Sequence, residues 1–146
     1  MRSKYKQIFF YGLFFILSGC GPRPEGQFTI IHTNDMHCQY LPVKAAWVDT
    51  MPQPFVGGMV ALEYHIRQLR EQHPNSLVLD AGDFMTGTPI SKIMVDSALG
   101  GAFVHMMDRV GYDAVTLGNH EFDEGQENLR HLMEIAGFDI LSANTL

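Results

Sequence analysis

Three short polar segments, each directly after an apolar run, constrain the fold of this chain more than any other feature. They are Asn-Asp-Met-His at residues 34–37, Asp-Ala-Gly-Asp at 80–83 and Gly-Asn-His-Glu-Phe-Asp at 118–123. The preceding runs are rich in aliphatic and β-branched residues and predict strands. Because sites in open α/β sheets form beyond the carboxyl ends of strands, we expect the three segments to converge. Their Asp, His and Asn side chains are the ligand types of a hydrolytic two-metal centre.

Predicted strands alternate with predicted helices along the chain. Residues 59–72 favour a helix, because Leu62, Ile66 and Leu69 share one face. This alternation indicates βαβ units and a mostly parallel sheet, which is an α/β fold. Residues 41–58 are rich in Pro and Gly and predict a loop. The strands are expected at residues 28–33, 76–80, 114–117 and 139–142. A second helix is expected along the apolar positions Phe103, Met106, Met107 and Val110, and it would end at Gly111. A third is expected along Leu129, Leu132, Met133 and Ala136, and it would end at Gly137.

The first nineteen residues have the layout of a secretory signal. Arg2, Lys4 and Lys6 form a basic start, and the apolar run at residues 8–17 is shorter than the roughly 20 residues that span a bilayer. This favours a signal peptide over an uncleaved anchor or a core helix. The Leu-Ser-Gly-Cys box that ends at Cys20 resembles the processing site of bacterial lipoproteins. That resemblance implies an acylated Cys20, a tether over residues 20–27, and a membrane-anchored protein facing the periplasm or the cell surface.

Charge and cysteine content exclude two classes of protein. The chain has 10 Lys and Arg against 16 Asp and Glu, a net charge of −6, and loss of the signal would make it more acidic. It therefore has no basic surface for a nucleic-acid polymer. Bound divalent cations would offset some of this acidity, although ordinary surface acidity explains it as well. With Cys20 acylated, Cys38 has no partner, which excludes a disulfide-stapled fold.

Each polar segment also has a simpler explanation when taken alone. In an extended segment Asp35 and His37 would point the same way and bind one ion, or Asp35 could belong to an Asx turn. Asp83, after Gly82, could bridge two cations or cap a turn, the latter role suiting Asp80 better. A turn explains Asn119 but not the adjacent His120. Only the combination at three consecutive strand ends points to a metal site.

Two of these segments resemble signatures of a known family, the 5′-nucleotidase branch of the calcineurin-like metallophosphoesterases. The sequence YDAVTLGNHEFD at residues 112–123 is similar to one signature and IIHTNDMH at 30–37 to another, and Gly57-Gly58, residues 80–83 and Gly87-Thr88 also fit. The resemblance implies a four-layer α/β/β/α sandwich. Residues 28–146 would form its N-terminal portion, incomplete at the C-terminus.

The family's roles transfer onto matching positions of this sequence. Two divalent cations, Zn, Mn or Fe, would activate a hydroxide that releases phosphate from nucleotide substrates. Asp83 would bridge both cations, and His120 would stabilise charge on the phosphate or the leaving oxygen as the catalytic histidine. Asp123 would support the site without binding a metal. The remaining metal ligands implied are Asp35 and His37 for the first ion and Asn119 for the second.

Two departures from the family pattern bear on activity. Cys38 stands where the family most often has Gly, and we expect a packed side chain rather than a reactive thiol. The family also needs a further His and a Gly-His-x-His segment, and no residue after His120 offers them. His131 reads as a solvated helix position, and His32 as a residue that either supports the ligand turn or packs. We therefore expect weak metal binding and little hydrolysis from this chain alone. Three explanations stay open: a truncated gene product, a fragmentary sequence, or one half of a split enzyme that a C-terminal chain complements.

Two other functions remain open from the sequence. One is a catalytically silent surface lipoprotein that serves as a binding or scaffold module. The other is a hydrolase of the same superfamily that acts on cyclic nucleotides, nucleotide sugars or thiosulfate-type esters.

Overall fold

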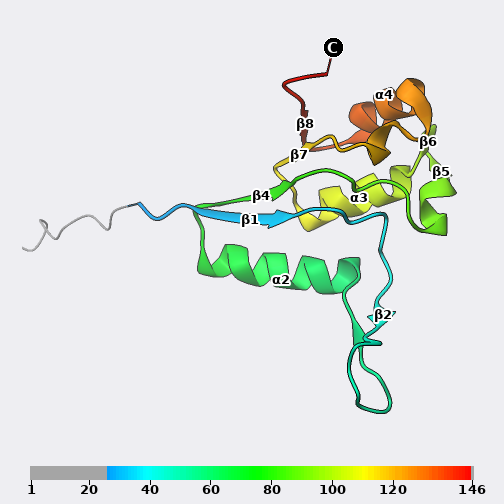
Figure 1. The fold of residues 1–146 in the computed structure, drawn as a ribbon. Helices are drawn as coiled ribbons and strands as arrows, with labels where there is room; N and C mark the ends of the chain where they lie inside the picture. The colour runs from blue at the N-terminus through cyan, green and yellow to red at the C-terminus, as the bar shows by residue number, and fades with distance from the viewer. Residues whose placement is uncertain (1–25, 146) are drawn as a thin grey trace, which may run out of the picture.

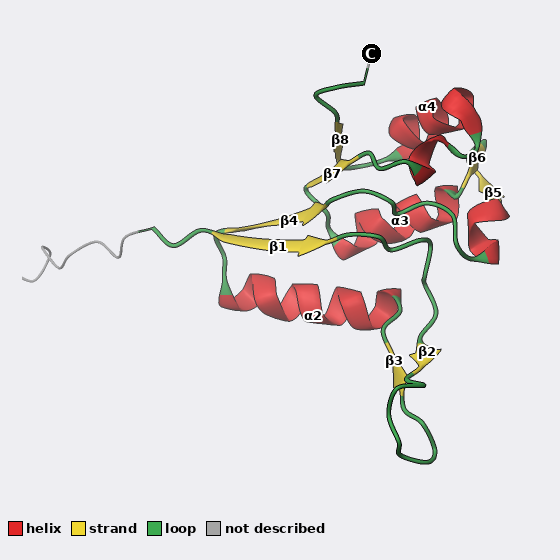
Figure 2. Ribbon diagram, in the orientation of Figure 1, coloured by secondary structure: helices red, strands yellow, loops and turns green. Residues whose placement is uncertain are grey.

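A four-stranded parallel sheet and three helices form the body of the protein (Figures 1 and 2). The computed structural model describes residues 26–145, so the predicted signal peptide, Cys20 and most of the tether lie outside the described residues. The strands lie in the order β1-β4-β7-β8. They are β1 (Thr29–Thr33), β4 (Ser76–Asp80), β7 (Ala114–Thr116) and β8 (Asp139–Leu141), and the helices between them are α2 (Met59–Gln72), α3 (Gly101–Val110) and α4 (Gly125–Ile135).

The order of the strands explains where the helices lie. Each helix connects two neighbouring parallel strands, and each step runs in the same direction across the sheet. Because such crossovers are right-handed, helices that connect strands in one direction lie on one face of the sheet. Figure 1 shows α3 between α2 and α4, so the helices follow the order of the strands that they connect. In register, Thr33 pairs with Asp80 and Asp80 with Val115, which brings the ends of β1, β4 and β7 to one edge.

The two faces of the sheet differ in burial. Ile31, Val78 and Val115 point toward the helices and are buried. On the opposite face the apolar side chains of Ile30, Leu77 and Leu141 are exposed, and no described helix covers them. Parallel sheets are usually covered on both faces. The expected α/β class is confirmed, and residues 26–145 form two of the four expected layers, one of helices and one of strands.

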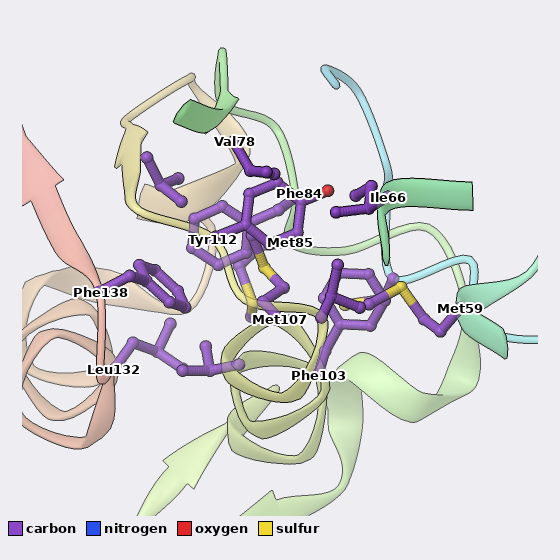
Figure 3. Close-up of a cluster of buried hydrophobic side chains, with 14 of the residues drawn as sticks. Met59, Ile66, Val78, Phe84, Met85, Phe103, Met107, Tyr112, Leu132 and Phe138 are labelled. Carbon is purple, nitrogen blue, oxygen red and sulfur yellow. The ribbon is translucent and has the colours of Figure 1, made fainter. Parts of the chain in front are cut away.

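The core lies between the sheet and the helices and includes the segment that follows β4. Phe84 and Met85 of that segment are buried with Phe103 and Met107 of α3. Figure 3 shows these side chains meeting Met59 and Ile66 of α2, Leu132 of α4 and the Phe138 ring. The polar segment at residues 80–83 therefore leads directly into the centre of the core.

The helices agree closely with the sequence pattern, with one exception. Helix α2 has the predicted bounds, and α3 ends at Val110 with Gly111 in the left-handed conformation (φ 89°), which confirms the predicted stop. In α4 Leu129 and Leu132 are buried, but Met133 is 49% exposed and Ala136 lies beyond the helix end. The predicted apolar stripe was therefore wrong at Met133, whereas Ala136 still packs against the core just past the end of the helix.

Two short hairpins were not expected from the sequence. Residues 41–58, predicted as a loop, contain the antiparallel pair β2 (Val43–Lys44) and β3 (Phe55–Val56), which projects from the end of α2 in Figure 1. A second pair, β5 (Met94–Val95) and β6 (Ala98–Leu99), follows the 3-10 helix η2 (Pro89–Lys92). A further 3-10 turn, η3 (His120–Phe122), lies between β7 and α4. None of the described helices has the length and apolar character needed to cross a membrane.

Candidate metal centre

Three side chains from three separate loops meet at the carboxyl ends of β1, β4 and β7. One ligand atom from each of His37, Asp83 and His120 lies within 4.8 Å of the other two. The imidazole rings of His37 and His120 meet edge to face, with centroids 5.0 Å apart. The expected convergence of the three polar segments is therefore present, and the group has the chemistry of a divalent-cation site.

The backbone around Asp35 and His37 differs from the expected extended segment. Both residues are in the left-handed region, with φ of 53° and 48°, so the prediction of an extended ligand pair was wrong. The cause is pairing with the next loop, since the amide of Asp35 donates to Gly82 O and that of His37 to Asp83 O, both at 3.0 Å. The side chains still approach, with Asp35 Oδ1 3.8 Å from His37 Nε2.

Close packing of glycines fixes the distance between these loops. A Cβ at Gly87 would lie 2.7 Å from His37 Cβ, and one at Gly118 would lie 2.1 Å from Asp83 Oδ1. These positions therefore admit no larger residue without a shift of the site. The two glycines account physically for sequence features that had been noted only as a resemblance.

Asp83 joins the second and third loops through its side chain. It has a φ of 56°, and its Oδ1 accepts a hydrogen bond of 3.0 Å from the amide of His120. Asn119 precedes His120 at the start of η3 and has an exposed side chain. The roles of Asp35 and Asn119 as metal ligands stay predictions.

His120 is paired with Asp123. Its Nδ1 lies 2.7 Å from Asp123 Oδ2, which leaves Nε2 free of this contact. The hydrogen bond to Asp123 raises the pKa of His120, and the same contact lowers the pKa of Asp123. The pair therefore favours an imidazolium and a carboxylate. Asp123 therefore contacts His120, and its expected supporting role in the site stays a prediction.

Asp80 has the structural role that was expected of it. It is buried, and it accepts hydrogen bonds from Thr33 Oγ1 (2.5 Å) and from the amide of Gly82 (2.9 Å). Burial raises the pKa of Asp80. The Tyr112 hydroxyl lies 2.7 Å from Thr33 Oγ1, and burial raises its pKa to about 12. This network holds the end of β1 against the end of β4 beneath the metal site.

Cys38, His131 and His32 lie outside the group of candidate ligands. Cys38 is fully buried, and burial raises its pKa to about 12, so it is a packed thiol as expected. His131 lies on the surface of α4 with its Nε2 3.3 Å from a carboxylate oxygen of Glu127. His32 is exposed on the sheet face opposite the helices, so of its two expected roles the packing role is wrong.

One residue of the site was missed from the sequence. Glu121 is buried and accepts hydrogen bonds from backbone amides of two loops. No local motif signals this role, because a capping box needs Ser or Thr three residues before the Glu and Gly118 stands there.

Comparisons with known proteins match most of the described chain. A family model described as calcineurin-like phosphoesterase matches residues 28–143. A probable 5′-nucleotidase of Treponema pallidum is 38% identical over 122 residues, which is 82% of this chain and 20% of that relative. The structure of a 5′-nucleotidase precursor from Thermus thermophilus has a TM-score of 0.69 and 34% identity, covering 80% of this chain and 22% of its own. The NAD nucleotidase of Haemophilus influenzae has a TM-score of 0.68 and 33% identity, covering 80% and 20%. The chain thus spans about a fifth of these proteins' lengths.

Proposed function

The chain belongs to the calcineurin-like phosphoesterase family, and we propose that it supplies part of the active site of a 5′-nucleotidase-type phosphohydrolase. The family is metal-dependent, and its relatives of this type are named for the hydrolysis of nucleotides. The observation that carries the proposal is the meeting of His37, Asp83 and His120 at the ends of three parallel strands.

We infer that two divalent cations bind here, of which Zn, Mn and Fe suit the ligands. Asp35, His37 and Asp83 would hold one ion, and Asp83 and Asn119 the other. The geometry supports the first ion, because ligand atoms of His37 and Asp83 lie within 4.8 Å of each other and Asp35 Oδ1 lies 3.8 Å from His37 Nε2. When bound, such ions lower the pKa of a water molecule and neutralise charge on the phosphoryl oxygens.

His120 is proposed as a hydrogen-bond donor to the substrate rather than as a metal ligand. Its Nε2 would face the phosphate or the leaving oxygen while Nδ1 donates to Asp123. The contact with Asp123 orients the ring and raises the pKa of His120, which suits a hydrogen-bond donor. A positioned donor of this kind contributes on the order of 10²–10⁴ in rate.

This chain alone is proposed to bind metal weakly and to hydrolyse little substrate. Its residues give the second ion only Asp83 and Asn119, and relatives are about five times longer than the matched region. The missing ligands and the substrate-binding surface would come from a C-terminal polypeptide. The substrate would be a nucleotide-type phosphate ester.

A chimaera tests the catalytic role. This chain would replace the matching region of the Treponema pallidum relative, and Mn²⁺-dependent phosphate release from AMP would be measured. We expect release by the chimaera and none by its Asp83→Asn form. Cyclic nucleotides and nucleotide sugars, assayed in parallel, distinguish the other hydrolase functions. A folded chimaera inactive on every ester would instead favour the silent scaffold module.

We also propose that the protein is exported and anchored to a membrane through a lipid on Cys20. The support is the sequence of residues 1–20 alone. Substitution Cys20→Ser should move the expressed chain from the membrane to the soluble fraction. A Cys20→Ser chain that still sediments with membranes contradicts the lipid anchor.

A further inference from the structure

Glu121 is a buried carboxylate that joins two loops of the candidate site. Only 1% of its surface is exposed. Its Oε2 accepts hydrogen bonds from the amides of Asp83 (3.0 Å) and Gly118 (2.6 Å), and its Oε1 accepts one of 3.0 Å from the amide of Met85. A buried carboxylate needs such donors, and bonds to a charged acceptor are stronger than neutral ones.

The loops that Glu121 joins have conformations that need support. Asp83 and Thr86 have φ of 56° and 58°, a region that costs an L residue on the order of 1–2 kcal/mol. Such conformations persist only when the surrounding structure fixes them. The amides of Asp83 and Met85 lie within this strained segment. Their hydrogen bonds to Glu121 therefore stabilise a backbone conformation that would otherwise relax.

Glu121 and Asp83 form a reciprocal clasp between the second and third loops. The carboxylate of Glu121 binds the amide of Asp83, and the carboxylate of Asp83 binds the amide of His120. Movement of either loop would break both bonds. The clasp therefore sets the distance between the Asp83 carboxylate and the His120 ring.

We propose that Glu121 is a positioning residue that holds the Asp83 loop and the Gly118–His120 loop at the separation required for metal binding. The role in metal binding rests on the proposed function, whereas the clasp is a property of the polypeptide itself. Glu121 need not touch the ion, because it acts through Asp83 and His120.

Glu121→Gln tests the clasp with almost no change in shape. A carboxamide has one acceptor oxygen and one donor group, so at least one of the three amides would face an N–H instead of an oxygen. Glu121→Asp keeps the charge but is one methylene too short to reach both loops. Glu134→Gln is the control, since it removes an equal charge from an exposed position that pairs with Arg130 on α4.

Two measurements on the whole 146-residue chain are required. Without metal, amide hydrogen exchange at Asp83, Met85 and Gly118 should accelerate at least tenfold in Glu121→Gln, while the Asp113 amide, which bonds to Val78 O, should change less than twofold. In Mn²⁺ titrations the apparent Kd should rise at least tenfold in both Glu121 variants and less than twofold in Glu134→Gln. Should Glu121→Gln fail to fold, Glu121→Asp carries the test.

The outcomes separate the positioning role of Glu121 from the proposed metal centre. Mn²⁺ affinity within twofold of the unaltered chain in the Glu121 variants would overturn the positioning role while leaving the metal centre intact. Recovery of affinity in Glu121→Asp but not Glu121→Gln would also overturn it, because charge alone would then explain the effect. An unaltered chain that binds no Mn²⁺ would contradict the proposed function itself, and with it any role of Glu121 in metal binding.

Discussion

Replacing Gly118 by Ala should disrupt the metal site through one methyl group. The added Cβ would lie 2.1 Å from Asp83 Oδ1 and 2.7 Å from Asp83 N, far inside van der Waals contact. Asp83 must then move, which breaks its hydrogen bond with the amide of His120. Overpacking of this kind costs about 1–3 kcal/mol of folding free energy. We expect unfolding at lower urea concentration and an apparent Kd for Mn²⁺ at least tenfold higher.

Gly111→Ala supplies a control with a similar loss of stability. A Cβ there meets no atom within 4 Å, but Gly111 has φ of 89°. The substitution should therefore cost about 1–2 kcal/mol through backbone strain alone, at the end of α3. Urea unfolding followed by circular dichroism measures stability, and calorimetric titration measures Mn²⁺ affinity. If Gly118→Ala binds Mn²⁺ as tightly as Gly111→Ala, the crowding of Asp83 does not control the site and the reasoning is refuted.

Three further changes test individual residues. In the chimaera, Asp83→Asn should collapse the metal content, measured by elemental analysis, because a shared charged ligand is lost, and unchanged metal content would contradict the bridging role. Asp123→Asn should lower the pKa of His120, so that in metal-free NMR titrations the ring loses its proton at lower pH than in the unaltered chain; an unchanged pKa would exclude Asp123 as its main cause. In a Cys20→Ser background, Cys38 should resist the thiol reagent DTNB at pH 8 until urea unfolds the chain, because a pKa of about 12 leaves little thiolate, and rapid labelling of the folded chain would contradict its burial.

The spacing of apolar residues and the alternation of strands and helices were enough to predict the main helices and the parallel sheet. Helix α2 lies between Gly58 and the Pro74-Asn75 turn, and its apolar spacing identified it along its whole length. The meeting of the three polar segments followed from parallel strands, whose carboxyl ends share an edge. The helix depends on residues close in sequence, and the meeting of the segments depends on the parallel sheet that alternating strands and helices indicate.

Other features depend on contacts between distant residues and were missed. Glu121 becomes part of the site only because Asp83 and Met85, from another loop, place their amides beside it. The left-handed backbone of Asp35 and His37 arises from pairing with the loop after β4, which no local propensity encodes. The two-residue strands of the hairpins are likewise too short for a periodic pattern to reveal.

The uncovered face of the sheet has a practical consequence for laboratory work with this chain. Ile30, Leu77 and Leu141 present apolar side chains to solvent on a folded protein. Dyes such as ANS fluoresce on exposed apolar surface. The folded chain should therefore increase the fluorescence of such a dye before any heating. In a melting curve followed with the dye, this high initial fluorescence would obscure the unfolding transition. Circular dichroism reports on the helices and strands themselves, so it measures unfolding without this dye fluorescence.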